Sequence, residues 1–424
     1  MMIGRTALLC VTALILSAAE GAAAKPFRLP DSQLLPASFD MLNGWASDDH
    51  VAALEAFRKS CEPILRRAKS KALVKPLELA LRDPCSRVVL YRMPVSGTIA
   101  RVFFEQNFRP VRISRVGESE GFITGYYEPE IEGSRKQHAE FDTPFYRRPP
   151  ELRSRAPAAS KLKGPSRAAS QTKVQTGTRK AGRIVPFHDR AAIEDGALDG
   201  RGLELVWTND EIDAFFTHIQ GSARVRLRDG SLMRINYDAQ NGHPYLAVGR
   251  VLIERGIVSK EEMTMDKIRT FISEHPEEGR ELMRMNRSYI FFREVGELGQ
   301  DDEPIGAQGV SLTAERSIAV DRNLHVYGTP FWIEATLPIE HESAETPFRR
   351  LMLAQDTGGA IVGPARADIY FGAGLEPGAV AGRLRHAGTF YMLVPNALDV
   401  AEITQIPLPQ KRPAELKPNG QSKQ

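Results

Sequence analysis

The stretch that decides the fold is Ala354–Gly374, which reads AQDTGGAIVGPARADIYFGAG. Two carboxylates, Asp356 and Asp368, stand 12 residues apart in it, among Gly, Ala and β-branched residues. The apolar run 351–354 precedes Asp356 and the run 369–371 follows Asp368, so each acid is expected at the end of a short buried strand. Carboxylates beside apolar strands often have shifted pKa values, which acid–base chemistry uses, whereas a turn-capping Asp is the simpler alternative.

The glycines between the two acids predict a change of chain direction. Gly358, Gly359 and Gly363 allow positive φ and close backbone approach, as a barrel corner or a sugar-lined groove requires. This segment is therefore expected to fold one acid back toward the other.

Length and composition describe an ordinary globular protein. The 424 residues are enough for two or three domains, and 42% are hydrophobic and 26% charged. The net charge of +3 is small, and no long basic block is interleaved with aromatic residues, so no nucleic-acid partner is expected.

The N-terminal segment 1–24 reads as a secretory signal peptide. Arg5 supplies the positive end, 7–18 the apolar core, and 22–24 small residues for cleavage. Cys10 lies inside the apolar core rather than after it, so lipidation is not expected and the mature chain is expected in the periplasm. No later stretch is long and apolar enough to span a bilayer.

Two cysteines, Cys61 and Cys85, remain after this processing. An even number in an exported chain favours a disulfide between them, with two buried free thiols as the alternative. The region around them, 25–121, predicts short helices separated at Pro63, Pro84 and Pro94.

Two segments of different amino-acid composition follow. Gly121–Ser134, GFITGYYEPEIEGS, reads as a strand whose aromatic residues could line a sugar groove, although a half-buried strand is the commoner case. Glu151–Arg183 carries nine Lys/Arg against one Glu and no aromatic residue, so it is expected to be a disordered basic insertion. It could hold an anionic polymer or simply be a solvated loop.

The rest of the chain alternates helical and strand patterns. Helices are expected at 211–219, 246–255, 265–274 and 277–285, and a hairpin turns at Asp229-Gly230. Short apolar strands are expected at 289–292, 306–312, 317–321, 331–335, 351–354, 369–371 and 390–393. Strands of this spacing favour a small closed barrel, and Asp321 is a third acid at a strand end. The Pro- and Lys-rich tail from 407 is expected to be disordered.

Carboxylates are the only concentrated acid–base groups in the sequence. No metal-ligand spacing, phosphate-binding loop or nucleophile elbow is found, and Asp356-Thr357-Gly358 has no second copy to form an aspartic-protease pair. Carboxylates alone favour glycosidic-bond chemistry, in which a hydrolase uses two acids and a lyase can use one. The sequence leaves open which of these applies to Asp356 and Asp368.

Six motifs, in order along the chain, resemble the membrane-bound lytic transglycosylase A family of peptidoglycan-cleaving enzymes. They are Phe122–Pro129, Gln220-Gly221-Ser222, Asn241-Gly242-His243, Val251–Gly256, Ser288–Phe292 and Ala354–Gly374. The resemblance implies a mainly β fold with N-terminal helices, in which a smaller β-barrel domain is inserted into a double-psi β-barrel domain and glycan lies between them. The implied divisions are 25–121 (helical part of domain 1), 122–286 (inserted domain), 287–406 (double-psi barrel) and 407–424 (tail).

The resemblance also implies roles for individual residues. Asp368, in Asp368-Ile369-Tyr370, matches the family's catalytic acid, and Asp356 and Asp321 match its supporting aspartates. Thr124, Tyr126, Gln220, Ser222 and Tyr370 are the substrate-binding candidates. No metal or cofactor is expected.

The leading hypothesis is a lytic transglycosylase that forms 1,6-anhydro-muramyl ends at the bond between N-acetylmuramic acid and N-acetylglucosamine. A peptidoglycan hydrolase using Asp356 as second carboxylate, and a non-catalytic wall-binding protein, are the alternatives. Expected partners are peptidoglycan glycan strands, with other cell-wall enzymes as further candidates, and a monomer is expected.

Overall fold

The computed structural model describes residues 29–67, 75–155, 175–180, 183–296, 298–299 and 302–398. The expected signal peptide, the expected tail from 407 and residues 156–174 of the basic insertion lie outside these ranges. Within them, no helix combines the length and hydropathy needed to cross a bilayer.

Six strands of the large sheet close into a barrel. In ring order they are β17 (Arg385–Pro395), β14 (Pro330–Leu337), β15 (Thr346–Asp356), β13 (Ser317–Ala319), β16 (Arg366–Ala373) and β3 (Gly121–Glu128), and a β3–β17 pairing completes the ring. The pairs β3–β16 and β13–β15 are parallel. Two further strands, β1 (Ser32–Pro36) and β2 (Phe108–Arg115), extend the sheet from β17. Closure leaves the ring itself without an unpaired edge.

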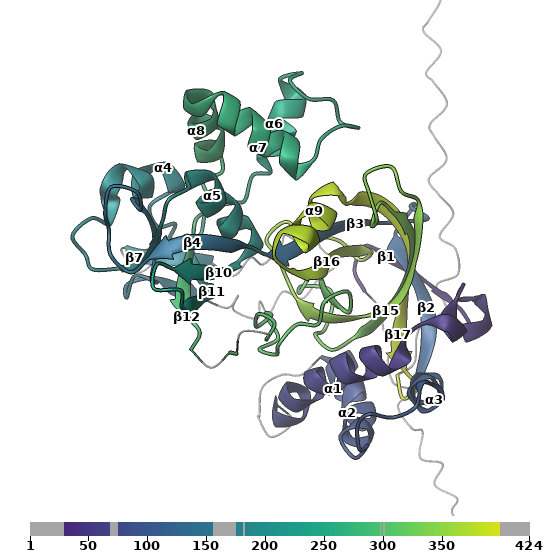
Figure 1. Ribbon diagram of the computed structural model, residues 1–424. Coiled ribbons are helices and arrows are strands. Elements are labelled where there is room, and N and C mark those ends of the chain that lie inside the picture. Colours follow the sequence, from purple (N-terminus) through teal and green to yellow (C-terminus); the bar gives the residue numbers. More distant parts are fainter. Residues whose placement is uncertain are drawn as a thin grey trace, which may run out of the picture.

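Three helices lie beneath the barrel (Figure 1) and share its core: α1 (His50–Arg67), α2 (Pro76–Val88) and α3 (Gly97–Asn107). A disulfide joins Cys61 of α1 to Cys85 of α2. The expected helix breaks at Pro63 and Pro84 are wrong, because both prolines lie inside helices. Burial of neighbouring side chains, including Ile64 and Cys85, outweighs the one backbone hydrogen bond that each proline removes.

The second sheet lies in the chain between β3 and β13. Its strands, in spatial order, are β12 (Ile290–Glu294), β11 (Leu232–Gln240), β10 (Ser222–Leu227), β4 (Glu130–Ser134), β9 (Glu204–Thr208) and β5 (Thr143–Tyr146). It has its own apolar core around Phe145, Val225 and Phe292. In Figure 1 this insert lies beside the barrel, and β3 leads directly into β4.

Helices of the insert are α4 (Arg190–Ala192), α5 (Glu211–Gln220), α6 (Val248–Glu254), α7 (Met265–Glu274) and α8 (Pro276–Met285). The last three pack around a core that includes Leu252, Ile272 and Leu282. The expected Asp229-Gly230 hairpin is present, since β10 and β11 pair antiparallel around it. The last barrel helix, α9 (Leu375–Arg383), was not anticipated.

The strand pairings mark where the two β parts meet in the sequence. β3 belongs to the barrel although its residues were expected in the insert, and β12 belongs to the insert although it follows residue 286. The described ends of the basic insertion form β6 (Arg153–Arg155) and β7 (Gln175–Lys180), which pair with each other, and β8 (Arg183–Val185) pairs with β7. Disorder is therefore the wrong expectation for those residues, since backbone hydrogen bonding orders them.

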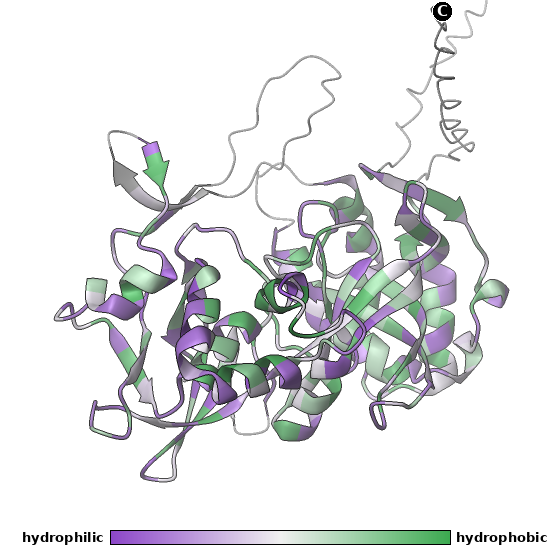
Figure 2. Ribbon diagram, turned by 90° about the horizontal axis from the view of Figure 1, so that it is seen from above, coloured by the Kyte–Doolittle hydropathy of each residue, from purple (hydrophilic) through white to green (hydrophobic). Residues whose placement is uncertain are grey.

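The mainly β architecture, with one β part inserted into a closed barrel, confirms the expected fold class. One expected strand is wrong: 306–312 forms a loop with a single bridge between Ile305 and Ser311. In Figure 2, polar and apolar residues are mixed along the helices and strands, and the barrel strands β15, β16 and β17 contain runs of consecutive buried residues.

Candidate active site

Asp368 lies on β16, opposite Thr124 on the parallel strand β3. The Thr124 hydroxyl donates to Oδ1 of Asp368 at 2.5 Å. The Asp368 side chain is half-buried. Its Oδ2 has no hydrogen-bond partner among the described residues and remains accessible to solvent. One carboxylate oxygen is thus held by the protein while the other is open.

Burial raises the pKa of the Asp368 carboxyl above its usual range. The positive charge of Arg366 and the Thr124 hydrogen bond act in the opposite direction. Because burial raises its pKa, the Asp368 carboxyl is more readily protonated than an exposed aspartate, while the opposing influences keep the ionised form accessible, as general acid–base catalysis requires.

Asp356, at the end of β15, has both oxygens engaged. Oδ1 accepts from the backbone N–H groups of Ala307 (2.9 Å) and Thr357 (2.8 Å), and Oδ2 accepts from the Tyr126 hydroxyl at 2.8 Å. Burial raises the pKa of Asp356, these three donors lower it, and the charge of Asp368 raises it again. These hydrogen bonds therefore fix both oxygens of the Asp356 side chain, whereas Asp368 keeps one oxygen available.

The short strand β13 separates the two acids. Ala319 of β13 pairs with Asp356 on one side and with Asp368 on the other. Two strand spacings put their Cα atoms about 10 Å apart. Ala319 belongs to an apolar cluster with Tyr126 and Tyr370, and its small side chain leaves the space between the two acids unfilled.

Asp321 has a different position from the other two aspartates. Its Oδ2 accepts from the backbone N–H of Gly363 at 3.0 Å, and its Oδ1 accepts from Asn323. Gly363 has φ +126°, a conformation that L side chains rarely adopt. Asp321 thus fixes the turn that leads from Asp356 to Asp368, and its hydrogen bonds among the described residues do not reach either acid. Of the three glycines expected to make this corner, only Gly363 has a positive φ.

Tyr126 and Tyr370 form a layer beneath the two acids. Their rings lie 5.2 Å apart, and burial raises the pKa of the Tyr126 phenol, which keeps it a donor to Asp356. Tyr370 is fully buried and its hydroxyl donates to Glu303 at 2.5 Å. None of the Tyr370 side chain is accessible in this structure, and its role in substrate binding stays a prediction.

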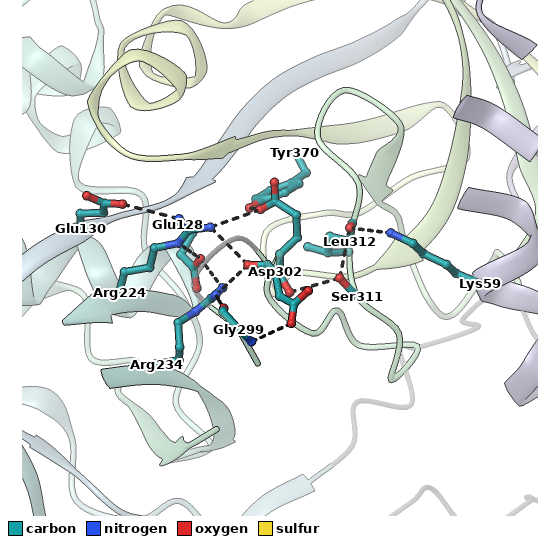
Figure 3. Close-up of polar contacts among 11 residues, drawn as sticks. Lys59, Glu128, Glu130, Arg224, Arg234, Gly299, Asp302, Ser311, Leu312 and Tyr370 are labelled. Atoms are coloured by element: carbon teal, nitrogen blue, oxygen red, sulfur yellow. Dashed lines mark hydrogen bonds and ion pairs between the residues drawn. The ribbon is translucent and has the colours of Figure 1, made fainter. Parts of the chain in front are cut away.

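A buried ion cluster lies behind this layer (Figure 3), where β3 leaves the barrel. Glu128 accepts from Arg224 at 2.9 Å and from Arg234 at 2.7 Å, and Glu128 and Arg234 are almost fully buried. The two arginines, which come from β10 and β11, also donate to the carbonyl of Asp302. The cluster joins the insert to the barrel strand that carries Thr124 and Tyr126.

Gln220 and Ser222 lie at the junction of α5 and β10. Oε1 of Gln220 accepts from the backbone N–H of Tyr127 at 3.1 Å, so Gln220 ties α5 to β3. Ser222 is 6% exposed and pairs with Asn236 in the β10–β11 hairpin. Neither is brought to Asp368 by a hydrogen bond among the described residues, whereas Thr124 and Tyr126 contact the two acids directly.

Two tyrosines that the sequence did not single out lie beside the acids. Tyr245, in the insert, is 37% exposed, and its Cβ lies 3.9 Å from the position a Cβ on Gly359 would take. Burial of its hydroxyl and then the charge of Asp368 raise the pKa of Tyr245 to about 12. Burial and then the charge of Asp356 likewise raise the pKa of Tyr327 to about 12. Tyr245 comes from the insert and Asp368 from the barrel, so the site is shared between the two.

The described residues contain no group of three or more His, Cys, Asp or Glu side chains arranged to hold a metal ion. The chemistry that the site offers is that of two unequal carboxyl groups, a hydroxyl relay and flanking aromatic rings. An aromatic face and a half-open carboxyl are the groups that a sugar ring and its glycosidic oxygen would meet.

Comparison with known proteins agrees with this arrangement. The family model described as the MltA specific insert domain matches residues 122–293, and the 3D domain model matches residues 316–394. The chain is 35% identical to the Escherichia coli protein named membrane-bound lytic murein transglycosylase A over 275 residues, which are 64% of this chain and 65% of that one. The matched region thus spans just under two thirds of that relative.

Solved structures extend the likeness over most of the chain. A membrane-bound lytic murein transglycosylase from Agrobacterium tumefaciens has a TM-score of 0.73 at 37% identity, covering 86% of this chain and 98% of that one. Escherichia coli MltA with bound chitohexaose has a TM-score of 0.59 at 27% identity, covering 87% and 93%. With both family models matched in order and nearly the whole Agrobacterium chain covered, this chain belongs to the MltA family of membrane-bound lytic murein transglycosylases.

Proposed function

We propose that this protein is a peptidoglycan lytic transglycosylase in which Asp368 alone acts as acid and base. The observation that carries the proposal is the inequality of the two acids: Asp356 has both oxygens engaged, and Asp368 has one oxygen free among the described residues. Family membership and the chitohexaose bound to the Escherichia coli relative support a β-1,4-linked amino-sugar polymer as the ligand class.

The reaction follows from the free oxygen. Protonated Asp368 donates its proton to the oxygen that links N-acetylmuramic acid to N-acetylglucosamine, and the C1–O bond breaks as positive charge develops at the anomeric carbon. The Asp368 carboxylate then takes the proton of the muramyl C6 hydroxyl while O6 bonds to C1. One glycosidic bond is exchanged for an internal one, water is neither added nor released, and Asp368 ends protonated for the next cycle.

Asp356 supports this chemistry from across β13. Its hydrogen bonds from Tyr126, Ala307 and Thr357 hold a negative charge beside the site where the anomeric carbon becomes positive. Thr124 orients Asp368, and Tyr245 on the insert offers an aromatic face to a sugar ring. Asp321 supports the site indirectly, by fixing the turn at Gly363.

A hydrolase with Asp356 as the second carboxylate is the competing function. The pKa of Asp356, raised by burial, and a spacing of about 10 Å between Cα atoms are compatible with a base that activates water. Against it, three donors already occupy Asp356, so a water molecule would have to share an oxygen that Tyr126 or a backbone N–H holds.

A test that separates these functions is the digestion of purified peptidoglycan sacculi, followed by mass spectrometry of the soluble muropeptides. We expect 1,6-anhydro ends, lighter by one water than reducing ends. Reducing ends would establish the hydrolase instead, and binding to sacculi without soluble products would establish a wall-binding protein. Such a role implies a periplasmic location after signal-peptide cleavage, which N-terminal sequencing of the exported protein would check.

A further inference from the structure

Arg366 is two residues before Asp368 on β16, and the two side chains leave the same face of the strand. Its Nη2 donates to the Thr124 hydroxyl oxygen at 2.8 Å. The guanidinium also lies over the ring of Phe122, 5.3 Å from the centroid, and Phe122 is opposite Arg366 in the β3–β16 register. Arg366 therefore contacts Phe122 and Thr124 on β3 without hydrogen bonding to Asp368 itself.

The donor and acceptor capacity of each group fixes the direction of the two hydrogen bonds that join Arg366 to Thr124 and Thr124 to Asp368. A guanidinium can only donate, and a hydroxyl has one proton. Because Thr124 accepts from Arg366, its single proton is free to point at Oδ1 of Asp368, as the 2.5 Å distance indicates. Oδ1 must then accept, so it cannot carry a proton directed at Thr124.

We propose that Arg366 is a positioning residue for the reaction: through the Thr124 hydroxyl it holds Oδ1 of Asp368 as an acceptor and so assigns the transferable proton to Oδ2. This inference rests on the proposed function of Asp368 and extends it from a residue to one atom. Oδ2 is the oxygen that the described residues leave free, so the proton lies on the side open to a glycosidic oxygen.

The indirect contact explains how one acid can serve in both halves of the cycle. A direct Arg–Asp ion pair would favour the ionised form strongly and oppose reprotonation. The Thr124 hydroxyl lies between Arg366 and Asp368, so the guanidinium does not pair directly with the carboxylate. Its charge lowers the pKa of Asp368, which burial raises, and the protonated form of Asp368 is retained. The arginine remains partly buried beside Asp368, where its charge is weakly screened.

The test compares the pH dependence of kcat/KM for anhydro-product formation in Arg366→Met, Arg366→Lys, Thr124→Val and Thr124→Ser. Activity that needs protonated Asp368 falls as pH rises past its pKa. Removing the arginine or the hydroxyl removes an influence that lowers this pKa, so Arg366→Met and Thr124→Val should move the alkaline limb to higher pH and reduce kcat at least about tenfold. Arg366→Lys and Thr124→Ser, which keep a donor at each step, should restore the position of the limb.

A double variant, Arg366→Met with Thr124→Val, tests whether the arginine acts through the hydroxyl. The reduction in kcat should be close to that of Thr124→Val alone, since the relay is already broken. Arg66→Met, which changes an exposed arginine on α1 paired with Glu62, is the matched control. Melting temperatures of all variants identify any that fail to fold, in which case the Lys and Ser substitutions still provide the comparison.

An unmoved alkaline limb in Arg366→Met and Thr124→Val, or full additivity in the double variant, would overturn the inference. Failure of the proposed function is recognised separately, because the wild-type protein would then release no anhydro ends. A loss of activity that is uniform across pH, and that the Lys and Ser substitutions do not repair, would leave Arg366 with a structural role only and would also overturn the inference.

Discussion

Glu128 and Asp368 are two carboxyl groups on neighbouring strands, β3 and β16, and burial raises the pKa of both. Glu128 receives hydrogen bonds directly from two guanidinium groups, whereas Asp368 receives one from a neutral hydroxyl. Direct cations favour the ionised carboxylate and fix the backbone where the insert begins. A neutral donor leaves the carboxyl able to change protonation state. The same burial thus produces a structural acid in one place and a reactive one in the other.

The substitution that should have the largest effect is Asp368→Asn. It removes the transferable proton while keeping the shape, so anhydro-product formation should fall about 10³-fold, within the range usual for loss of a general acid. Soluble muropeptides quantified over time, with Arg66→Met as control, measure the effect. A variant that keeps a tenth of wild-type activity and an unchanged melting temperature would remove Asp368 from the mechanism.

Glu128→Gln should act on stability rather than on the chemical step. Two arginines, one of them 4% exposed, would lose a charged partner, and breaking a buried pair of this kind typically lowers the free energy of unfolding by about 3 kcal/mol. Urea denaturation measures the loss. Glu130→Gln is the control, because Glu130 is 39% exposed and its ion pairs should contribute about 0.5 kcal/mol. Equal losses in the two variants would show that burial does not distinguish them.

His325 adds a buried group that should stay neutral. Burial lowers its pKa to about 4, against 6.5 for an exposed histidine, and its Nε2 lies 2.8 Å from the Pro364 carbonyl. Between these two values the unfolded chain binds more protons, so stability should fall as pH decreases from 6.5 to 4, by up to about 3 kcal/mol. His325→Gln should flatten the pH dependence of the unfolding free energy in this window, and the exposed His341→Gln should not. Parallel curves for wild type and His325→Gln would contradict the assignment.

Asp356→Asn should have the smallest effect of the four. The asparagine oxygen can still accept from Ala307 and Thr357, but its NH₂ group cannot accept from Tyr126, and the negative charge is lost. Activity should fall about 10- to 100-fold, a loss of about 1.4–2.7 kcal/mol in transition-state stabilisation, with the anhydro product retained. A loss as complete as that of Asp368→Asn would favour the two-carboxylate mechanism.

Local signals in the sequence predicted much of the secondary structure. Helix α7 begins and ends at the expected residues, and Asp229-Gly230 forms its hairpin, because both depend on periodicity or turn chemistry within a few residues. Helix α9 was missed since its glycines conceal its helical propensity. A Cβ at Gly378 would lie 2.7 Å from the Tyr127 ring, so this helix contains glycine to pack closely on β3.

The site was predictable only in part for a related reason. The motifs identified Thr124, Tyr126, Asp356 and Asp368, and hydrogen bonds join them in two pairs, Thr124 with Asp368 and Tyr126 with Asp356. Tyr245, Glu303 and Arg366 had no local signal, because each acquires its position from partners on strands or loops that are distant in the sequence. Tyr370 was assigned to the substrate from its motif, but alternation along β16 alone could not show that Glu303 lies over its hydroxyl.

The contact between Thr124 and Asp368 joins residues that are 244 positions apart in the chain. A flexible loop of that length is slow to close. A folded insert would shorten the length of flexible chain between β3 and β16 that has to close. We therefore expect the insert to fold first and the barrel to close afterwards, so that amides of β16 gain protection from hydrogen exchange later than those of β10 and β11. In this order of folding, the contact between Thr124 and Asp368 would form only after the rest of the molecule has folded.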